Sequence, residues 1–199
     1  MIAYRTAYLK ANYPVEFMSA VLSAESRGNT GPARDEKIAM MLSECKRMGV
    51  PILPPDINAS DVDFTIEKGS VRFGLSAIKN VGTAAIESIL NARSSVGPFR
   101  SLSDFLNRVD LSKVNSKTIE SLVKAGALSS FGKKSAMLAV LPSMLSEIHK
   151  KKRSVAAGQV GLFDADALAS EPSTDLPDIS ELSLEELLAY EIEHLGVYV

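Results

Sequence analysis

Apolar residues recur at helical spacing in a series of short segments, and glycine or proline separates one segment from the next. Pro14 suits the first turn of such a helix, and residues 27–34 are expected to form a loop after it. Asp35 is expected to cap the next helix, which Gly49 and Pro51 should end. This pattern predicts a mainly α fold built from short helices.

One small β-hairpin interrupts the helices. Residues 64–66 and 71–73 alternate apolar and polar side chains, and Lys68 with Gly69 supplies a tight turn between them. Three prolines between 51 and 55 predict an extended connection ahead of this hairpin.

After the hairpin the sequence predicts further short helices, followed by a linker. Pro142 should kink or divide the last of these helices. Residues 151–180 lack periodicity and are rich in Ala, Ser, Asp and Pro, which is typical of a linker, and 181–199 outline an acidic amphipathic helix. The helices are expected at roughly 83–93, 101–109, 115–125 and 133–150.

The net charge of -2 hides an asymmetry between two parts of the chain. Residues 1–153 hold all 22 Lys and Arg against 14 acids, a balance of +8. Residues 154–199 hold ten acids and no Lys or Arg, a balance of -10. The positively charged first part can therefore bind a polyanion, whereas the negatively charged second part would repel one.

Cys45 is the only cysteine, which excludes internal disulfides and thiolate metal cages and favours a reducing, cytoplasmic location. A small core residue is the expected role of Cys45. No run approaches the roughly 18 to 20 apolar residues of a membrane span, and no signal peptide is visible, so we expect no membrane partner.

The most informative stretch is a turn with glycine between two expected helices. Gly82 lets the backbone approach another surface closely, and Asn80 tolerates a left-handed conformation. The first N–H groups of the following helix then point outward and can bind a phosphate without reading sequence. The expected DNA-binding residues of this turn are Lys79, Asn80, Val81, Gly82 and Thr83, with Arg93 adding charge nearby. An ordinary helix–turn–helix corner is the alternative.

A second, looser candidate lies within residues 115–138. Gly126 sits between apolar neighbours as Gly82 does, and Lys124, Lys133 and Lys134 surround it. Two such turns could grip both backbones of a duplex. The basic run at 150–153 is more typical of a solvated helix end.

The expected linker contains a glutamine, Gln159, and an adjacent apolar pair, Leu162 and Phe163. Such a pair suggests a pocket on a partner protein, with the glutamine supplying directional hydrogen bonds. The alternative is that the pair folds back on the helices.

We find no catalytic residues and no metal site in the sequence. Asp61 and Asp63 are better explained as strand-entry residues than as metal ligands. His149 and His194 lie in different segments without a nucleophile to support them, and no glycine-rich nucleotide loop appears. No cofactor is therefore expected.

The whole chain resembles the bacterial DNA polymerase III alpha subunits, which are C-family replicative polymerases. The resemblance lies in a series of sequence blocks that occur in the same order. The blocks that carry the resemblance are Ala7–Lys10, Tyr13–Met18, Cys45–Gly49, Leu53–Asn58, Arg72–Leu75, Ala77–Gly82, Gly97–Phe99, Leu102, Asp104, Phe105 and Leu122–Leu128. Asn80 stands where the general hairpin motif most often has glycine, although the polymerase family tolerates this.

The resemblance implies a tandem helix–hairpin–helix region that holds duplex DNA behind the active site of a Mg-dependent DNA polymerase. Gln159, Leu162 and Phe163 resemble the internal motif that docks on the beta sliding clamp, and other holoenzyme subunits would be reached through the parent chain. The family's palm aspartates have no counterpart here, so the fragment alone is expected to be inactive. The implied divisions are 1–60 as the end of a helical fingers segment, 61–150 as the β-hairpin with the tandem helix–hairpin–helix domain, 151–180 as the clamp-binding linker, and 181–199 as an acidic helix leading to a missing OB domain.

Two rival interpretations remain open. Helix–hairpin–helix pairs also occur in DNA-repair modules, which would explain the Gly82 turn but not residues 159–163. A scaffold whose helices bind only protein is the other rival, and duplex-binding and clamp-binding assays separate the three.

Overall fold

The computed structural model describes residues 2–28, 31–156 and 176–198 and is mostly helical, with one small sheet. This confirms the predicted mainly α class. The α-helices are α1 (Ile2–Asn12), α2 (Pro14–Gly28), α3 (Pro32–Arg47), α4 (Thr83–Val96), α5 (Leu102–Arg108), α6 (Ser116–Lys124), α7 (Lys134–Ala156) and α9 (Leu184–Leu195). Short 3-10 helices are η1 (Leu75–Ala77) and η2 (Ser129–Phe131). No described helix is long and apolar enough to cross a bilayer.

The sheet contains the predicted hairpin and one further strand. β2 (Thr65–Glu67) pairs antiparallel with β3 (Ser70–Arg72) through Lys68 and Gly69, whose φ angles of 49° and 79° suit a tight hairpin turn. β1 (Ile52–Leu53) pairs in parallel with β3, giving the order β1-β3-β2. The proline-rich connection is therefore extended, as predicted. Two of its residues form β1, which was not predicted.

The start of α3 differs from the prediction. The helix begins at Pro32 with Gly31 as its N-cap, so Asp35 lies in the first turn instead of capping it. The cap prediction was wrong because proline presets the φ of a first helical position and starts the helix earlier. The loop before α3 is correspondingly shorter than 27–34.

Of the predicted kink or division of α7 at Pro142, the structure excludes the division. The helix runs without division through Pro142 and beyond the expected end at 150. Proline removes only one backbone donor, and the neighbouring Leu141, Met144 and Leu145 are buried in the core. That burial favours a single continuous helix over a break at Pro142.

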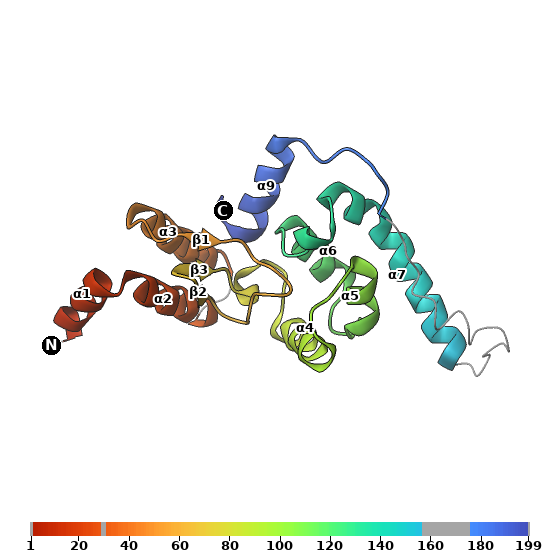
Figure 1. Ribbon diagram of the computed structural model, residues 1–199, viewed down its shortest axis with the longest axis horizontal. Helices are drawn as coiled ribbons and strands as arrows, with labels where there is room; N and C mark the ends of the chain where they lie inside the picture. The colour runs from red at the N-terminus through yellow and green to blue at the C-terminus, as the bar shows by residue number, and fades with distance from the viewer. Residues whose placement is uncertain (1, 29–30, 157–175, 199) are drawn as a thin grey trace.

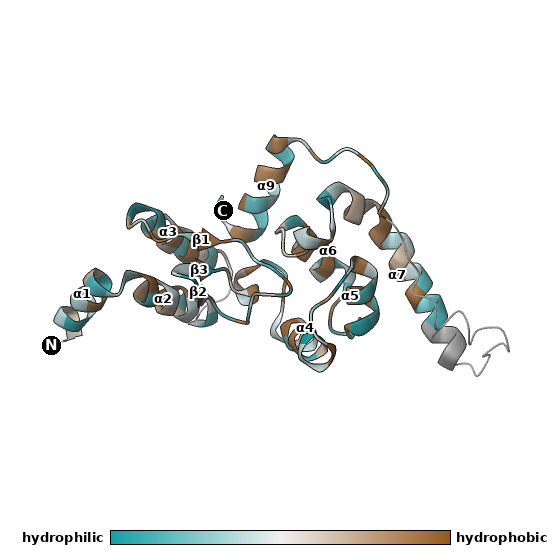
Figure 2. Cartoon of the chain, viewed as in Figure 1, coloured by the Kyte–Doolittle hydropathy of each residue, from teal (hydrophilic) through white to brown (hydrophobic). Residues whose placement is uncertain are grey.

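One continuous core joins the described residues, from Met18 in α2 to Leu195 in α9. Figure 2 shows hydrophobic and hydrophilic residues interspersed along the helices, and the buried hydrophobic ones form this core. The rings of Phe64 and Phe73 meet at 4.9 Å between the centroids. Cys45 is fully buried in this core, and burial raises its thiol pKa to about 11, which agrees with the predicted packing role.

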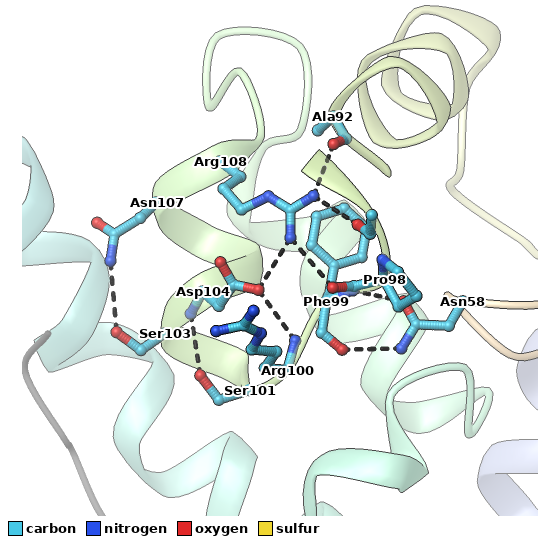
Figure 3. A network of polar contacts seen from close by, with 11 residues as sticks. Asn58, Ala92, Pro98, Phe99, Arg100, Ser101, Ser103, Asp104, Asn107 and Arg108 are labelled. Atoms are coloured by element: carbon cyan, nitrogen blue, oxygen red, sulfur yellow. Dashed lines mark hydrogen bonds and ion pairs between the residues drawn. The ribbon is translucent and has the colours of Figure 1, made fainter. Parts of the chain in front are cut away.

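A half-buried arginine, Arg108, fixes the turn that follows α4 (Figure 3). Arg108 Nη2 donates to the carbonyl oxygens of Ala92 and Gly97, at 2.7 Å each. Its Nη1 donates to the Asp104 carboxylate at 2.9 Å, and the guanidinium lies 4.4 Å from the centre of the Phe99 ring. Arg108 therefore ties the end of α4 to α5 and holds the hairpin region in shape.

α9 packs on α6 and lies between the two ends of the molecule (Figure 1). A capping box of Ser183 and Glu186 starts this helix, and Gly196 ends it at a φ of 78°. This confirms the predicted acidic helix. Its last turn buries Leu195 and reaches the turn between η1 and α4.

Candidate nucleic-acid interface

The first hairpin is the turn Lys79–Thr83, between η1 and α4. Asn80 has a φ of 63°, the predicted left-handed conformation. Gly82 is the N-cap of α4 and provides no side-chain hydrogen bond to it. The opening N–H groups of a helix have no acceptor within the helix, so the start of α4 suits an external anion.

Gly82 is not required by the internal structure. Its φ is -85°, which any residue adopts, and a Cβ at this position would meet no atom within 4 Å. Neither backbone strain nor packing within the described residues therefore explains this glycine. A side chain here would extend over the start of α4 and obstruct a close external ligand.

Asn80 fastens the first hairpin to α6. Its Nδ2 donates to Ser121 Oγ at 3.2 Å, and its carbonyl oxygen accepts from Thr118 Oγ1 at 3.1 Å. Residues at the starts of α4 and α6, among them Ala84 and Thr118, line one groove. Two positive helix ends therefore lie near one another.

A groove of about 790 Å³ runs along this surface. Lys79 lies on it, and so does Lys113 from the loop between α5 and α6. Arg34, Asp35 and Glu36 form its α3 edge, so the groove is not uniformly basic. Lys113 was not predicted from the sequence, because it has no helical periodicity and is far from the hairpin in the chain.

Arg93 does not take part in this surface. It lies in the last turn of α4, and its Nη1 donates to the carbonyl oxygens of Ile57 and Ser60, at 3.0 and 2.7 Å. The expectation that Arg93 adds charge near Gly82 was wrong because the helix carries it to the opposite end. Its role is to hold the connection ahead of the β-hairpin.

The second hairpin has a different construction from the first. Gly126 has a φ of 83° and ends α6, with its N–H donating to Val123 at 3.0 Å. The next N–H, of Ala127, donates to Leu122 at 2.9 Å, which completes a Schellman cap. Gly126 therefore corresponds in conformation to Asn80, whereas the sequence analysis compared it with Gly82.

The start of α7 beyond this hairpin is already occupied. The two carboxylate oxygens of Glu181 accept from the backbone N–H groups of Lys134 and Ser135, at 2.9 Å each. Lys133 Nζ pairs with Asp178 at 2.9 Å. An internal anion thus holds the position that we predicted for a phosphate.

The other two lysines of the second hairpin are also engaged. Lys134 Nζ donates to the carbonyl oxygen of Lys124 at 3.1 Å, and burial lowers the Lys134 pKa. Lys124 Nζ lies 5.0 Å from the centre of the Tyr190 ring in α9. In this conformation the three lysines around Gly126 face the protein, whereas Lys79 and Lys113 line an open groove.

Hydrogen bonding keeps the two acidic residues charged. Burial raises the Glu181 pKa, but hydrogen bonds from Ser135, Leu182 and Lys134 outweigh it and lower the pKa overall. The hydrogen bond from Lys133 lowers the Asp178 pKa.

The remaining predicted features lie away from the two hairpins or outside the described residues. The basic run at 150–153 lies in the final turns of α7. Gln159, Leu162 and Phe163 lie outside the described residues. Among the residues that the structure does describe, no three His, Cys, Asp or Glu side chains are placed to hold a metal ion.

Comparison with known proteins relates this geometry to a family. A family model of the helix-hairpin-helix motif matches residues 49–138, which include both hairpins. The DNA polymerase III subunit alpha of Thermus aquaticus is 43% identical over 199 residues, covering 100% of this chain and 15% of that protein. The corresponding subunits of Saccharopolyspora erythraea and Chlamydia pneumoniae are 41% and 40% identical over 100% of this chain.

The chain spans 15–17% of the length of these three relatives. The similarity extends through every described element and is not confined to the helix-hairpin-helix motif. This chain therefore belongs to the DNA polymerase III alpha subunit family, and over its full length it matches one segment of those subunits.

Proposed function

We propose that this chain is a non-catalytic part of a replicative polymerase that holds duplex DNA through its first hairpin, without sequence specificity. The open position of Gly82 beside the start of α4 carries the proposal, since it leaves backbone N–H groups accessible to a phosphate. Lys79 and Lys113 add positive charge along the same groove. Phosphate contacts fix position without reading bases, so unrelated duplexes should bind alike.

The test is duplex binding, by fluorescence anisotropy, of the chain and two variants at Gly82. Wild-type protein should bind unrelated duplexes in the ~1 to 100 µM range of non-specific contacts. Gly82→Val should weaken binding equally for all sequences, and Gly82→Ala should weaken it less because its side chain is shorter. Sequence-specific binding, or unchanged binding by Gly82→Val, would contradict the proposal.

We further propose that Gln159, Leu162 and Phe163 tether the chain to the beta sliding clamp. The support is the spacing of a glutamine and an apolar pair, within a family of clamp-dependent polymerases. Burying Leu162 and Phe163 in a cleft contributes roughly 3 to 6 kcal/mol, from which ordering costs are subtracted. Titration of purified clamp should give micromolar affinity.

Changing Leu162 and Phe163 together to Ala should abolish clamp binding and leave duplex binding intact, because the two sites share no residues. If this double substitution leaves clamp affinity unchanged, the motif does not bind the clamp. Clamp binding also separates the polymerase interpretation from a DNA-repair module.

The chemistry of the parent polymerase would then lie outside this chain. We expect Mg²⁺ and the catalytic aspartates to belong to other parts of the alpha subunit, together with its contacts to other holoenzyme subunits. A clean preparation of this chain should incorporate no nucleotide on a primed template with Mg²⁺. Incorporation above background would contradict a non-catalytic role.

A further inference from the structure

We propose that residues 176–183 compete with DNA for the second hairpin, with the Glu181 carboxylate in the place of a phosphate. The inference rests on the proposed DNA binding and concerns how the second contact is made available. It assigns a regulatory role to a segment that the sequence pattern divided between the predicted linker, 151–180, and the predicted acidic helix, 181–199.

Glu181 occupies the start of α7 in the way that a phosphate would. Glu181 binds with both carboxylate oxygens to two consecutive backbone N–H groups, of Lys134 and Ser135, at 2.9 Å each. A phosphate would use the same donors at a helix N-terminus, because it too offers paired anionic oxygens. The two ligands cannot occupy these donors at the same time.

The neighbouring cation, Lys133, is bound by the same segment. Lys133 Nζ donates to Asp178 and to the carbonyl oxygen of Ile179, at 2.9 Å each. The lysine next to the helix start is therefore neutralised by the same segment that supplies Glu181. One displacement would free a lysine and two backbone donors together.

Residues 176–183 are held to α7 by exposed contacts. Residues 176–183 form no helix or strand, and the Asp178 side chain is 97% exposed. Ion pairs this exposed are weak and screened by salt. Leu176 provides an apolar attachment for the segment. It is half-buried and packs against the core beside Gly132.

These features define two arrangements of the interface. In the closed arrangement only the first hairpin is open to DNA. In the open arrangement residues 176–183 leave α7, and the second hairpin adds its own phosphate contact. A duplex held at the first hairpin raises the local phosphate concentration and so favours the exchange.

The test compares duplex affinity, at low salt, for the 199-residue chain and matched variants. Asp178→Asn with Glu181→Gln should bind roughly fivefold tighter than wild type, since the competing charges are gone. Glu185→Gln removes one exposed charge from the same region without touching α7 and should change affinity less than about twofold. Leu176→Ala should also tighten binding, although it alters no charge. Unfolding curves establish that each variant is folded.

Adding Lys133→Ala to the Asp178→Asn and Glu181→Gln background should abolish most of the gain. The proposal is overturned if Glu185→Gln matches the double variant, or if the gain survives loss of Lys133. Either result leaves binding at the first hairpin intact. If no form binds duplex DNA, the proposed function itself fails, and this inference with it.

Discussion

The backbone N–H of Lys79 donates to the carbonyl oxygen of His194 at 3.0 Å, which joins the first hairpin directly to the last turn of α9. The His194 side chain is buried at this junction, and its Nδ1 lies 3.1 Å from the Tyr190 carbonyl oxygen. Burial lowers the His194 pKa, and the charges of Lys124 and Lys79 act in the same direction. The Tyr190 contact and the charge of Glu193 raise it by less.

Docking of α9 should therefore weaken in mild acid. Because the folded pKa of His194 lies below its ordinary 6.5, the unfolded state takes up a proton first as the pH falls. This stabilisation is complete above about pH 6.5 and is lost below it. Hydrogen exchange of α9 amides between pH 7 and 5 measures the loss, after correction for intrinsic exchange rates. His194→Gln should flatten the dependence, whereas His149→Gln, at an exposed position on α7, should preserve it. An identical pH dependence in His194→Gln would exclude this cause.

The two hairpin glycines should respond differently to alanine. Gly126→Ala places a side chain at a φ of 83° and should cost about 1 to 2 kcal/mol of unfolding free energy. Gly82→Ala meets no neighbour and has an ordinary φ, so its cost should stay below about 0.5 kcal/mol. Urea denaturation of both variants measures the difference. Equal costs would show that the two turns are built alike.

Arg108→Ala should be among the more destabilising single changes. It removes the donors to the carbonyl oxygens of Ala92 and Gly97 and the ion-pair partner of Asp104. The loss should be about 2 to 4 kcal/mol, because these acceptors are partly buried. Arg100→Ala is the control, since only its backbone N–H binds Asp104. Denaturation midpoints that match in the two variants would contradict the role given to Arg108.

Lys113→Ala tests the lysine that the sequence analysis missed. If Lys113 contacts one phosphate, its loss should weaken all duplexes equally and reduce the salt-dependence slope by about one. Lys37→Ala removes the same charge from α3, where Lys37 pairs with Glu25 outside the groove. Affinities measured over a series of salt concentrations give both slopes. A slope change shared by the two variants would indicate a general charge effect.

Local patterns predicted the features that depend on near neighbours in the chain. The β-hairpin followed from alternation around Lys68 and Gly69, and the left-handed Asn80 from its tolerance of positive φ. The start of α3 was misplaced because a proline at the first helical position outweighed the capping preference of Asp35. β1 was missed because its partner β3 is distant in sequence.

The interface was less predictable because tertiary packing assembles it. Lys113 reaches the groove only through the packing of α6 against Asn80. Glu181 reaches the start of α7 because α9 docks on α6, and nothing in its own neighbourhood predicts that contact. The comparison of Gly126 with Gly82 failed because similar flanking residues can occupy opposite ends of a helix.

The long-range bond between Lys79 and His194 also has a consequence for the order of folding. The two hairpins are built from contacts between neighbouring elements and can form early, whereas α9 must close a very long loop before it gains any contact. We therefore expect docking of α9 to be a late step in folding and its release to be an early step in unfolding. A folding intermediate with both hairpins formed and α9 detached would expose the α6 surface that the helix normally covers.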